Sequence, residues 1–200
     1  MILVIDSATE ACSVALLDGQ EVVRERHEIV GRGHAERLIP MIAELLGGDT
    51  PDEILVDCGP GSFTGIRVGL AAAHGLAIGW GVPVRGYSSL ALIATQGAGP
   101  ELAVALHGGH GQLFVQTFMR EPFSPAGPLE SLFPEEAAAR VTARTVLGSG
   151  AALLVETRGS GEAVEAWPRA ADARLLLPEL RTLAPRPLYG RAPDAKPMPA

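Results

Sequence analysis

Cysteine is scarce in this sequence, whose 200 residues include only two, Cys12 and Cys58. Both lie inside apolar runs, and two separate thiols make neither a metal cluster nor a disulfide framework. We therefore expect a reduced, cytoplasmic setting. Basic residues are also few, with 16 Lys and Arg against 23 Asp and Glu, so the formal net charge is -7. That balance provides no basic surface of the kind that holds nucleic acid.

Long hydrophobic runs are absent as well, although 47% of the residues are hydrophobic. No run is long enough to span a bilayer, so we expect no membrane contact. The N-terminal stretch MILVIDSATE reaches the acidic Asp6 without a basic start, and we expect no signal peptide there. The hydrophobic content suffices for one medium domain or two small lobes to bury a core.

The first half of the sequence predicts a sheet with helices. An antiparallel meander is expected first, followed by an amphipathic helix in which Pro40 implies either a kink or a later start. A buried strand, a glycine-rich loop, a second helix and another strand then form a βαβ crossover, and Ser88 caps a short helix. The expected strands are 2–5, 13–17, 21–29, 53–59 and 82–87, and the expected helices are 34–46, 64–79 and 89–95.

The stretch QGAGP, residues 96–100, breaks the pattern and marks a boundary between an N-terminal lobe, 1–98, and a C-terminal lobe, 99–200. The second lobe is predicted to hold strands at 102–107, 112–119 and 145–150, helices at 134–140 and 173–183, and an extended proline-rich tail over 184–200. Two lobes, each a mixed sheet with helices, the second reduced, indicate an α/β fold of the actin-like and sugar-kinase (ASKHA) type.

The loop GPGSFTGIRVGLAAAHGLA, residues 59–77, predicts a possible anion site, because a helix N-terminus presents free amides. It lacks the lysine of a nucleotide-binding loop, since Ile66 and Arg67 follow Gly65. In the alternative interpretation, the glycines allow positive φ and close approach of the chain, and Thr64 caps the helix. Both interpretations stay open. The candidate anion-site residues are Gly59, Gly61, Ser62, Thr64, Gly65 and Arg67.

The helix that follows this loop is apolar on two opposite faces. Ile66, Leu70, Ala73 and Ala77 form one face, which suits packing on the chain's own sheet. The opposite face is built from small residues that let another helix approach closely. That neighbour is the preceding helix, a second copy of the chain, or a different protein. The second face comprises Val68, Ala71, Ala72, Gly75 and Gly79.

Four segments, IDSATEACSVAL, GHAERLIPMIAELL, the glycine-rich loop with its helix, and PLYGRAPDAK, resemble the TsaB family of tRNA threonylcarbamoyladenosine biosynthesis. The resemblance implies a two-lobed ASKHA fold and no catalysis by this chain. It implies a heterodimer with TsaD, assistance by the ATPase TsaE, ATP and metal on those partners rather than on this chain, and tRNA bound only through the complex. A homodimer is possible. The interface residues it implies are His34, Leu38, Ile42, Leu45, Val68, Ala71, Ala72, Gly75 and Gly79.

One segment departs from the family pattern. The turn LHGGHGQ, residues 106–112, stands where family members usually carry an Asp-Ala-Arg turn, so a contact made by that turn is in doubt.

An actin-like ATPase or small-molecule phosphotransferase is the main alternative. Asp6 would then hold a metal-bound water, and the hairpin 7–12 would hold phosphates. This hairpin lacks the glycine needed for close approach to a nucleotide, and LGSGAA near Gly148 is a weak second loop. We therefore expect Asp6 to be structural and assign no catalytic residue.

A metallopeptidase is the other alternative. His34 stands alone on its helix, and His107 and His110 lie in a turn without a third ligand. We expect no metal site.

Overall fold

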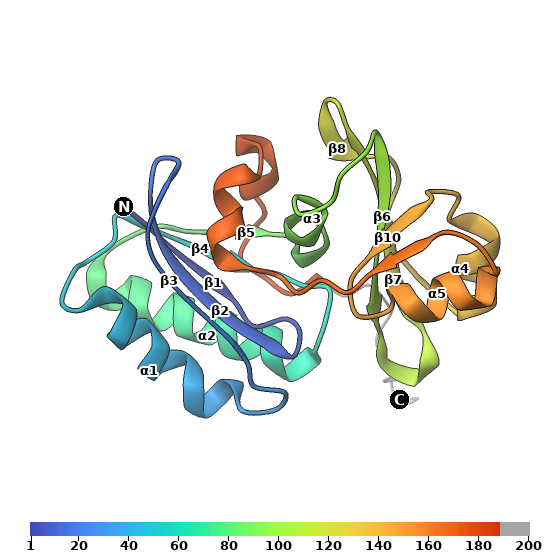
Figure 1. Cartoon of the computed structure of the whole chain (residues 1–200). Coiled ribbons are helices and arrows are strands. Elements are labelled where there is room, and N and C mark those ends of the chain that lie inside the picture. Colours follow the sequence, from blue (N-terminus) through green and yellow to red (C-terminus); the bar gives the residue numbers. More distant parts are fainter. Residues whose placement is uncertain (189–200) are drawn as a thin grey trace, which may run out of the picture.

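The structure is a computed structural model that describes residues 1–188, so the last twelve residues of the predicted tail lie outside the described part. The N-terminal half forms a five-stranded sheet in the order β3-β2-β1-β4-β5 (Figure 1). The first three strands pair antiparallel, and β4 and β5 join β1 in parallel. The elements are β1 Ile2–Asp6, β2 Ala11–Asp18, β3 Glu21–Ile29, α1 His34–Leu46, β4 Glu53–Asp57, α2 Phe63–Trp80, β5 Val84–Tyr87 and α3 Ser89–Ala94.

The second half contains a six-stranded sheet in the order β11-β10-β6-β7-β8, with β9 paired to β7. The predicted hairpin of β6 and β7 and the helix α4 are confirmed, whereas α5, β8, β9 and β11 were not predicted. The elements are β6 Glu101–His107, β7 Leu113–Arg120, β8 Phe123–Pro125, β9 Glu130–Leu132, α4 Pro134–Arg140, β10 Thr145–Leu147, α5 Ala151–Arg158 and β11 Glu162–Val164, followed by the 3-10 turns η2 Ala170–Leu175 and η3 Pro178–Arg181.

Helices α1 and α2 cover one face of the first sheet, and α3 lies toward the second lobe (Figure 1). Under α1 and α2, one buried cluster joins residues such as Ile5, Leu38 and Leu70. A second cluster runs through both lobes, because Tyr87 and Leu90 of the first lobe pack with Phe118 of the second. The two lobes therefore share a core, and the architecture is the two-lobed α/β arrangement that the sequence predicts.

The chain returns to the first lobe after the second sheet. The amide of Ala170 donates to Ser13 Oγ at 2.9 Å, and Leu183 pairs with Gly86 across an isolated bridge. Residues 170–188 therefore pack on the first lobe, although the sequence assigned them to the second. The predicted helix over 173–183 is wrong: two 3-10 turns replace it, because Pro178 lacks the amide that a continuous helix needs.

The N-terminus of α2 packs against the connection between β1 and β2. A Cβ at Gly61 would overlap the carbonyl oxygen of Ala8, and a Cβ at Gly65 would overlap that of Ser7. Ser7 Oγ donates to the carbonyl of Gly65 at 2.9 Å, and the amide of Ser62 donates to Ala8 O at 2.6 Å. The close-approach interpretation of this loop therefore holds for these glycines.

The helix cap lies two residues before the predicted one. Ser62 has an extended backbone, and its Oγ accepts from the amide of Gly65 at 3.2 Å, so Ser62 and not Thr64 caps α2. Helix α1 starts at His34 and contains Pro40, which excludes the later start.

Two carboxyl groups are sealed beneath this packing. Asp6 accepts from Tyr87 Oη at 3.0 Å and from the amide of Ala8 at 3.2 Å. Asp57 Oδ1 accepts from the amide of Ser7 at 2.9 Å, whereas Asp57 Oδ2 has no hydrogen-bond partner within residues 1–188. Burial raises the pKa of Asp6 from 3.8 to about 7 and the pKa of Asp57 well above its usual range, where the charge on Asp6 adds to the effect.

Substituting one glycine of α2 tests the close approach. Gly65→Ala is expected to lower the free energy of unfolding by about 1 to 3 kcal/mol, because the new Cβ displaces the backbone of Ser7. Gly79→Ala is the matched control, since a Cβ at Gly79 meets nothing within 4 Å and alanine is the better helix former by about 1 kcal/mol. Urea unfolding measures both, and equal effects of the two variants would contradict the packing.

The sealed carboxyls predict a pH dependence of stability. The folded state holds a proton on Asp6 up to about pH 7, whereas the unfolded chain releases it near 3.8, so the free energy of unfolding falls as pH rises between these values. Asp6→Asn resembles the protonated form and should remove on the order of 4 kcal/mol of this fall. Urea unfolding from pH 4 to 8 measures it. Asp18→Asn, at an exposed position, should leave the slope unchanged, and an unchanged slope in Asp6→Asn would refute the assignment.

Candidate functional site

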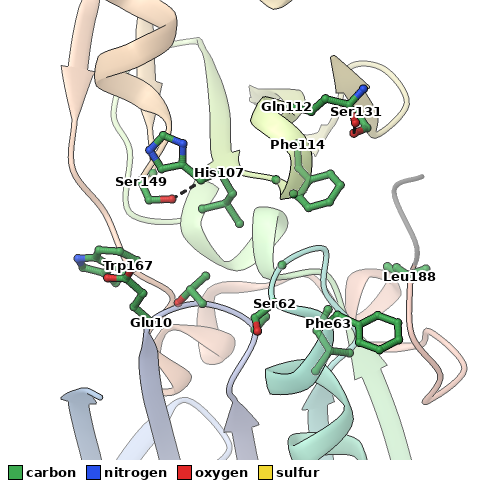
Figure 2. Close-up of a pocket in the computed structure, with 18 of the residues that line it drawn as sticks. Glu10, Ser62, Phe63, His107, Gln112, Phe114, Ser131, Ser149, Trp167 and Leu188 are labelled. Atoms are coloured by element: carbon green, nitrogen blue, oxygen red, sulfur yellow. Dashed lines mark hydrogen bonds between the residues drawn. The ribbon is translucent and has the colours of Figure 1, made fainter. Parts of the chain in front are cut away.

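A cleft of about 1600 Å³ lies between the two lobes. The first lobe contributes the connection after β1, with Glu10, and the start of α2, with Ser62 and Phe63. The second lobe contributes the turn after β6 and the loop after β10. Figure 2 shows His107 and Ser149 together on the second-lobe side, where the amide of His107 and Ser149 Oγ lie 3.3 Å apart, facing Ser62 and Phe63 across the cleft.

The cleft has few groups that could perform phosphotransfer chemistry. Glu10 and Glu165 line it together with Arg32 and Arg67, so acidic and basic side chains balance. Within residues 1–188, no group of three or more His, Cys, Asp or Glu side chains comes together in a way that could hold a metal ion. The cleft therefore offers shape and some aromatic surface rather than a strong local charge.

Asp6, the residue that an actin-like ATPase would require, does not line this cleft. Its side chain is fully buried, and both carboxyl oxygens accept hydrogen bonds from the core. The structure therefore places Asp6 as the expected structural residue at the end of β1. Its carboxyl lacks a path to a nucleotide or metal-bound water in the cleft.

The predicted anion-site residues are only partly brought together. Gly61, Ser62 and Arg67 line the cleft, whereas Gly59 and Gly65 are buried beside it. Gly59 has a φ of 92°, as its glycine identity allows. The guanidinium carbon of Arg67 lies 3.4 Å from the ring centroid of Phe63, a cation–π contact at the mouth of the loop. Anion binding here stays a prediction, and packing already accounts for Gly61 and Gly65.

The interface residues predicted on α1 lie in the core. His34 is 5% exposed and its Nε2 lies 3.2 Å from the carbonyl oxygen of Ala11, while the three apolar residues are 2% exposed or less. The prediction is wrong for these four as surface residues, because the apolar stripe of an amphipathic helix faces its own sheet. They are His34, Leu38, Ile42 and Leu45. The exposed face of α1 carries Ile39 instead, at 49% exposure.

The interface residues predicted on α2 divide into two groups. Val68 and Ala72 are half-buried and pack against the first-lobe core. Ala71, Gly75 and Gly79 are exposed, and a Cβ at either glycine would meet nothing within 4 Å. Together with Ile78 they form one stripe, which we call the outer stripe of α2.

Ile78 was not predicted, although its spacing of seven from Ala71 could have identified it on a helical wheel. It is 85% exposed, a rare environment for such a side chain.

Within residues 1–188, none of the helices combines the length and hydrophobicity needed to cross a bilayer.

Comparison with known proteins agrees with this architecture. A protein-family model described as TsaD, tRNA N6-adenosine threonylcarbamoyltransferase, matches residues 22–121, which is half of the chain. The tRNA threonylcarbamoyladenosine biosynthesis protein TsaB of Escherichia coli is 46% identical over 105 residues. That alignment covers 48% of this chain and 43% of the relative, so the chain spans less than half of the relative's length.

Two solved structures from Pseudomonas aeruginosa extend the likeness to nearly the whole chain. One, described as an uncharacterized protein with similarity to peptidase YEAZ, is 28% identical with a TM-score of 0.80, covering 95% of this chain and 99% of its own. The other, described as YeaZ, is 29% identical with a TM-score of 0.78, and it covers 94% of this chain and 98% of its own. The chain belongs to the family of the model that matches half of it, and its TsaB relatives together with the two YeaZ-like structures identify it as a TsaB-type member of that family.

Proposed function

We propose that this chain is a non-catalytic subunit in the formation of N6-threonylcarbamoyladenosine on tRNA, and that it binds and activates TsaD. The observation that carries the proposal is the outer stripe of α2. Glycine costs about 1 kcal/mol relative to alanine inside a helix, yet Gly75 and Gly79 border only open space within the described chain. Such small residues permit a second helix to approach closely, and the neighbouring Ile78 gives it apolar area to bury.

The chemistry of the reaction falls to the partners in this proposal. Because Asp6 is sealed from the cleft, we assign ATP and metal to TsaD and to the ATPase TsaE, and none to this chain. The net charge of -7 supports contact with tRNA only through the complex, in the cytoplasm. Two copies of this chain could also pair through the same stripe, and such a homodimer would compete with the heterodimer.

An actin-like ATPase or small-molecule phosphotransferase is the second candidate. The cleft of about 1600 Å³ favours it, since a cavity of this size between two lobes accommodates a nucleotide. The buried position of Asp6 argues against it.

The stripe is tested by Gly75→Leu. Leucine is the better helix former and displaces nothing in the isolated chain, so the melting temperature should equal or exceed that of the wild type. Association with TsaD should weaken at least about tenfold, because the new side chain fills the space of the partner helix. Thermal melts and co-purification with TsaD from the same organism measure the two effects.

Ala139→Leu is the matched control for this test, since it enlarges an exposed helical residue in the second lobe and should leave association unchanged. A stable Gly75→Leu variant that binds TsaD normally would remove the stripe from the interface.

Activity of the purified chain distinguishes the two candidates. Alone, it should neither hydrolyse ATP nor modify tRNA, because its cleft lacks a reachable carboxylate at the Asp6 position. Adding it to TsaD, TsaE and the other substrates should raise the yield of threonylcarbamoyladenosine, measured by nucleoside chromatography. ATP turnover by the isolated chain that disappears in Asp6→Ala would establish the phosphotransferase instead.

A further inference from the structure

A second cavity, of about 510 Å³, carries a concentration of positive charge that is unusual for this acidic chain. It lies where the returning segment of η2 and η3 covers the face of the first sheet opposite α1 and α2 (Figure 1). Arg85, Arg174 and Arg181 line it, and Glu53 is the one acidic residue among its lining residues. We call these four residues and the space between them the arginine cavity.

The three arginines differ in how far their donors are used. Arg85 Nε lies 3.1 Å from Glu53 Oε1, so this pair is neutral. Arg181 donates through Nε at 2.9 Å and through a terminal nitrogen at 2.6 Å to the carbonyl of Leu176, and the same terminal nitrogen donates to Arg174 O at 2.8 Å. Those carbonyls are uncharged, so the acidic side chain that acts on Arg181 is Glu53, which already pairs with Arg85.

Arg174 is the arginine that the fold itself leaves unsatisfied. Its Nε is buried and has no hydrogen-bond partner within residues 1–188. A buried donor without a partner destabilises a protein, and native structures rarely retain one without a reason. Burial also lowers the pKa of the Arg181 guanidinium, which an anion beside it would oppose. The arginine cavity therefore sets three guanidinium groups against one carboxylate, and the buried Nε of Arg174 lacks a hydrogen-bond partner within residues 1–188.

We propose that the arginine cavity binds a phosphate group. A guanidinium offers paired N–H donors whose fork matches two phosphate oxygens, and apolar walls such as Ile2 and Leu55 strengthen the attraction by excluding water. A phosphate also carries enough charge to offset both Arg174 and Arg181. The phosphate belongs to an RNA backbone or to a small phosphorylated ligand. This site lies apart from the cleft and from the outer stripe of α2, and it does not depend on the proposed function.

Thermal unfolding of the full chain in inorganic phosphate tests the site, with chloride at matched ionic strength as the reference. Phosphate at about 100 times its Kd should raise the melting temperature by roughly 5 °C. Arg174→Met keeps the apolar stem and removes the donors, so the phosphate-dependent rise should disappear. Its melting temperature in chloride should match or exceed that of the wild type, because the unsatisfied Nε is gone.

Two further variants keep the test decisive. Arg144→Met, at an exposed arginine of the second lobe, should retain the full response to phosphate. Arg85→Gln, at an exposed position on the rim, should fold and respond more weakly. The proposal is overturned if the wild type shows no rise beyond chloride, if Arg174→Met keeps it, or if Arg174→Met melts well below the wild type, which would make Arg174 a structural residue.

The source of the phosphate is identified in the same assay. Unmodified tRNA that raises the melting temperature of the wild type, but not that of Arg174→Met, assigns the site to an RNA backbone. A nucleoside monophosphate that raises the melting temperature as phosphate does assigns it to a small ligand. Each result supports the site itself.

Discussion

The contact between the N-terminus of α2 and the connection after β1 is the constraint on which the first lobe depends. Gly61 and Gly65 leave no room for a Cβ beside the carbonyls of Ala8 and Ser7, and the hydrogen bond from Ser7 Oγ to Gly65 O fixes the approach. This contact sets the crossover helix against the sheet at a short distance. It also turns a glycine pattern typical of ligand-binding loops into a packing device, since the amide of Ser62 is used within the fold.

Sealing the strand ends has a chemical consequence. A carboxylate at the end of the first strand serves catalysis only if it reaches the space between the lobes. Here Asp6 is fully buried, and burial raises its pKa to about 7 and favours the neutral form inside the core, against the opposite effect of the hydrogen bond from Tyr87. The cleft is retained without the group that a phosphotransferase would need there. A protein of this family with such a cleft is well suited to the binding role proposed for it.

Two surfaces of this molecule carry features that lower its stability when it stands alone. The outer stripe of α2 keeps glycines at exposed helix positions, with Ile78 beside them in water. The arginine cavity keeps the buried Nε of Arg174 without a hydrogen-bond partner in the described chain. The proposed explanation is the same for both, namely that a helix of TsaD and a phosphate group supply the missing contacts. The outer stripe of α2 and the arginine cavity lie on opposite faces of the first sheet.

Local pattern determined much of this fold: the strand Glu21–Ile29, the helices His34–Leu46 and Pro134–Arg140, and the two-lobed class, because periodicity and turn residues act within a few positions. The glycine-rich motif identified the family for the same reason. Only the tertiary structure decided that His34 and its stripe are core, that residues 170–188 return to the first lobe, and that Arg174 meets two other arginines in a cavity. Those outcomes depend on contacts between residues far apart in sequence, where the geometry of packing rather than local preference determines which side chains are buried.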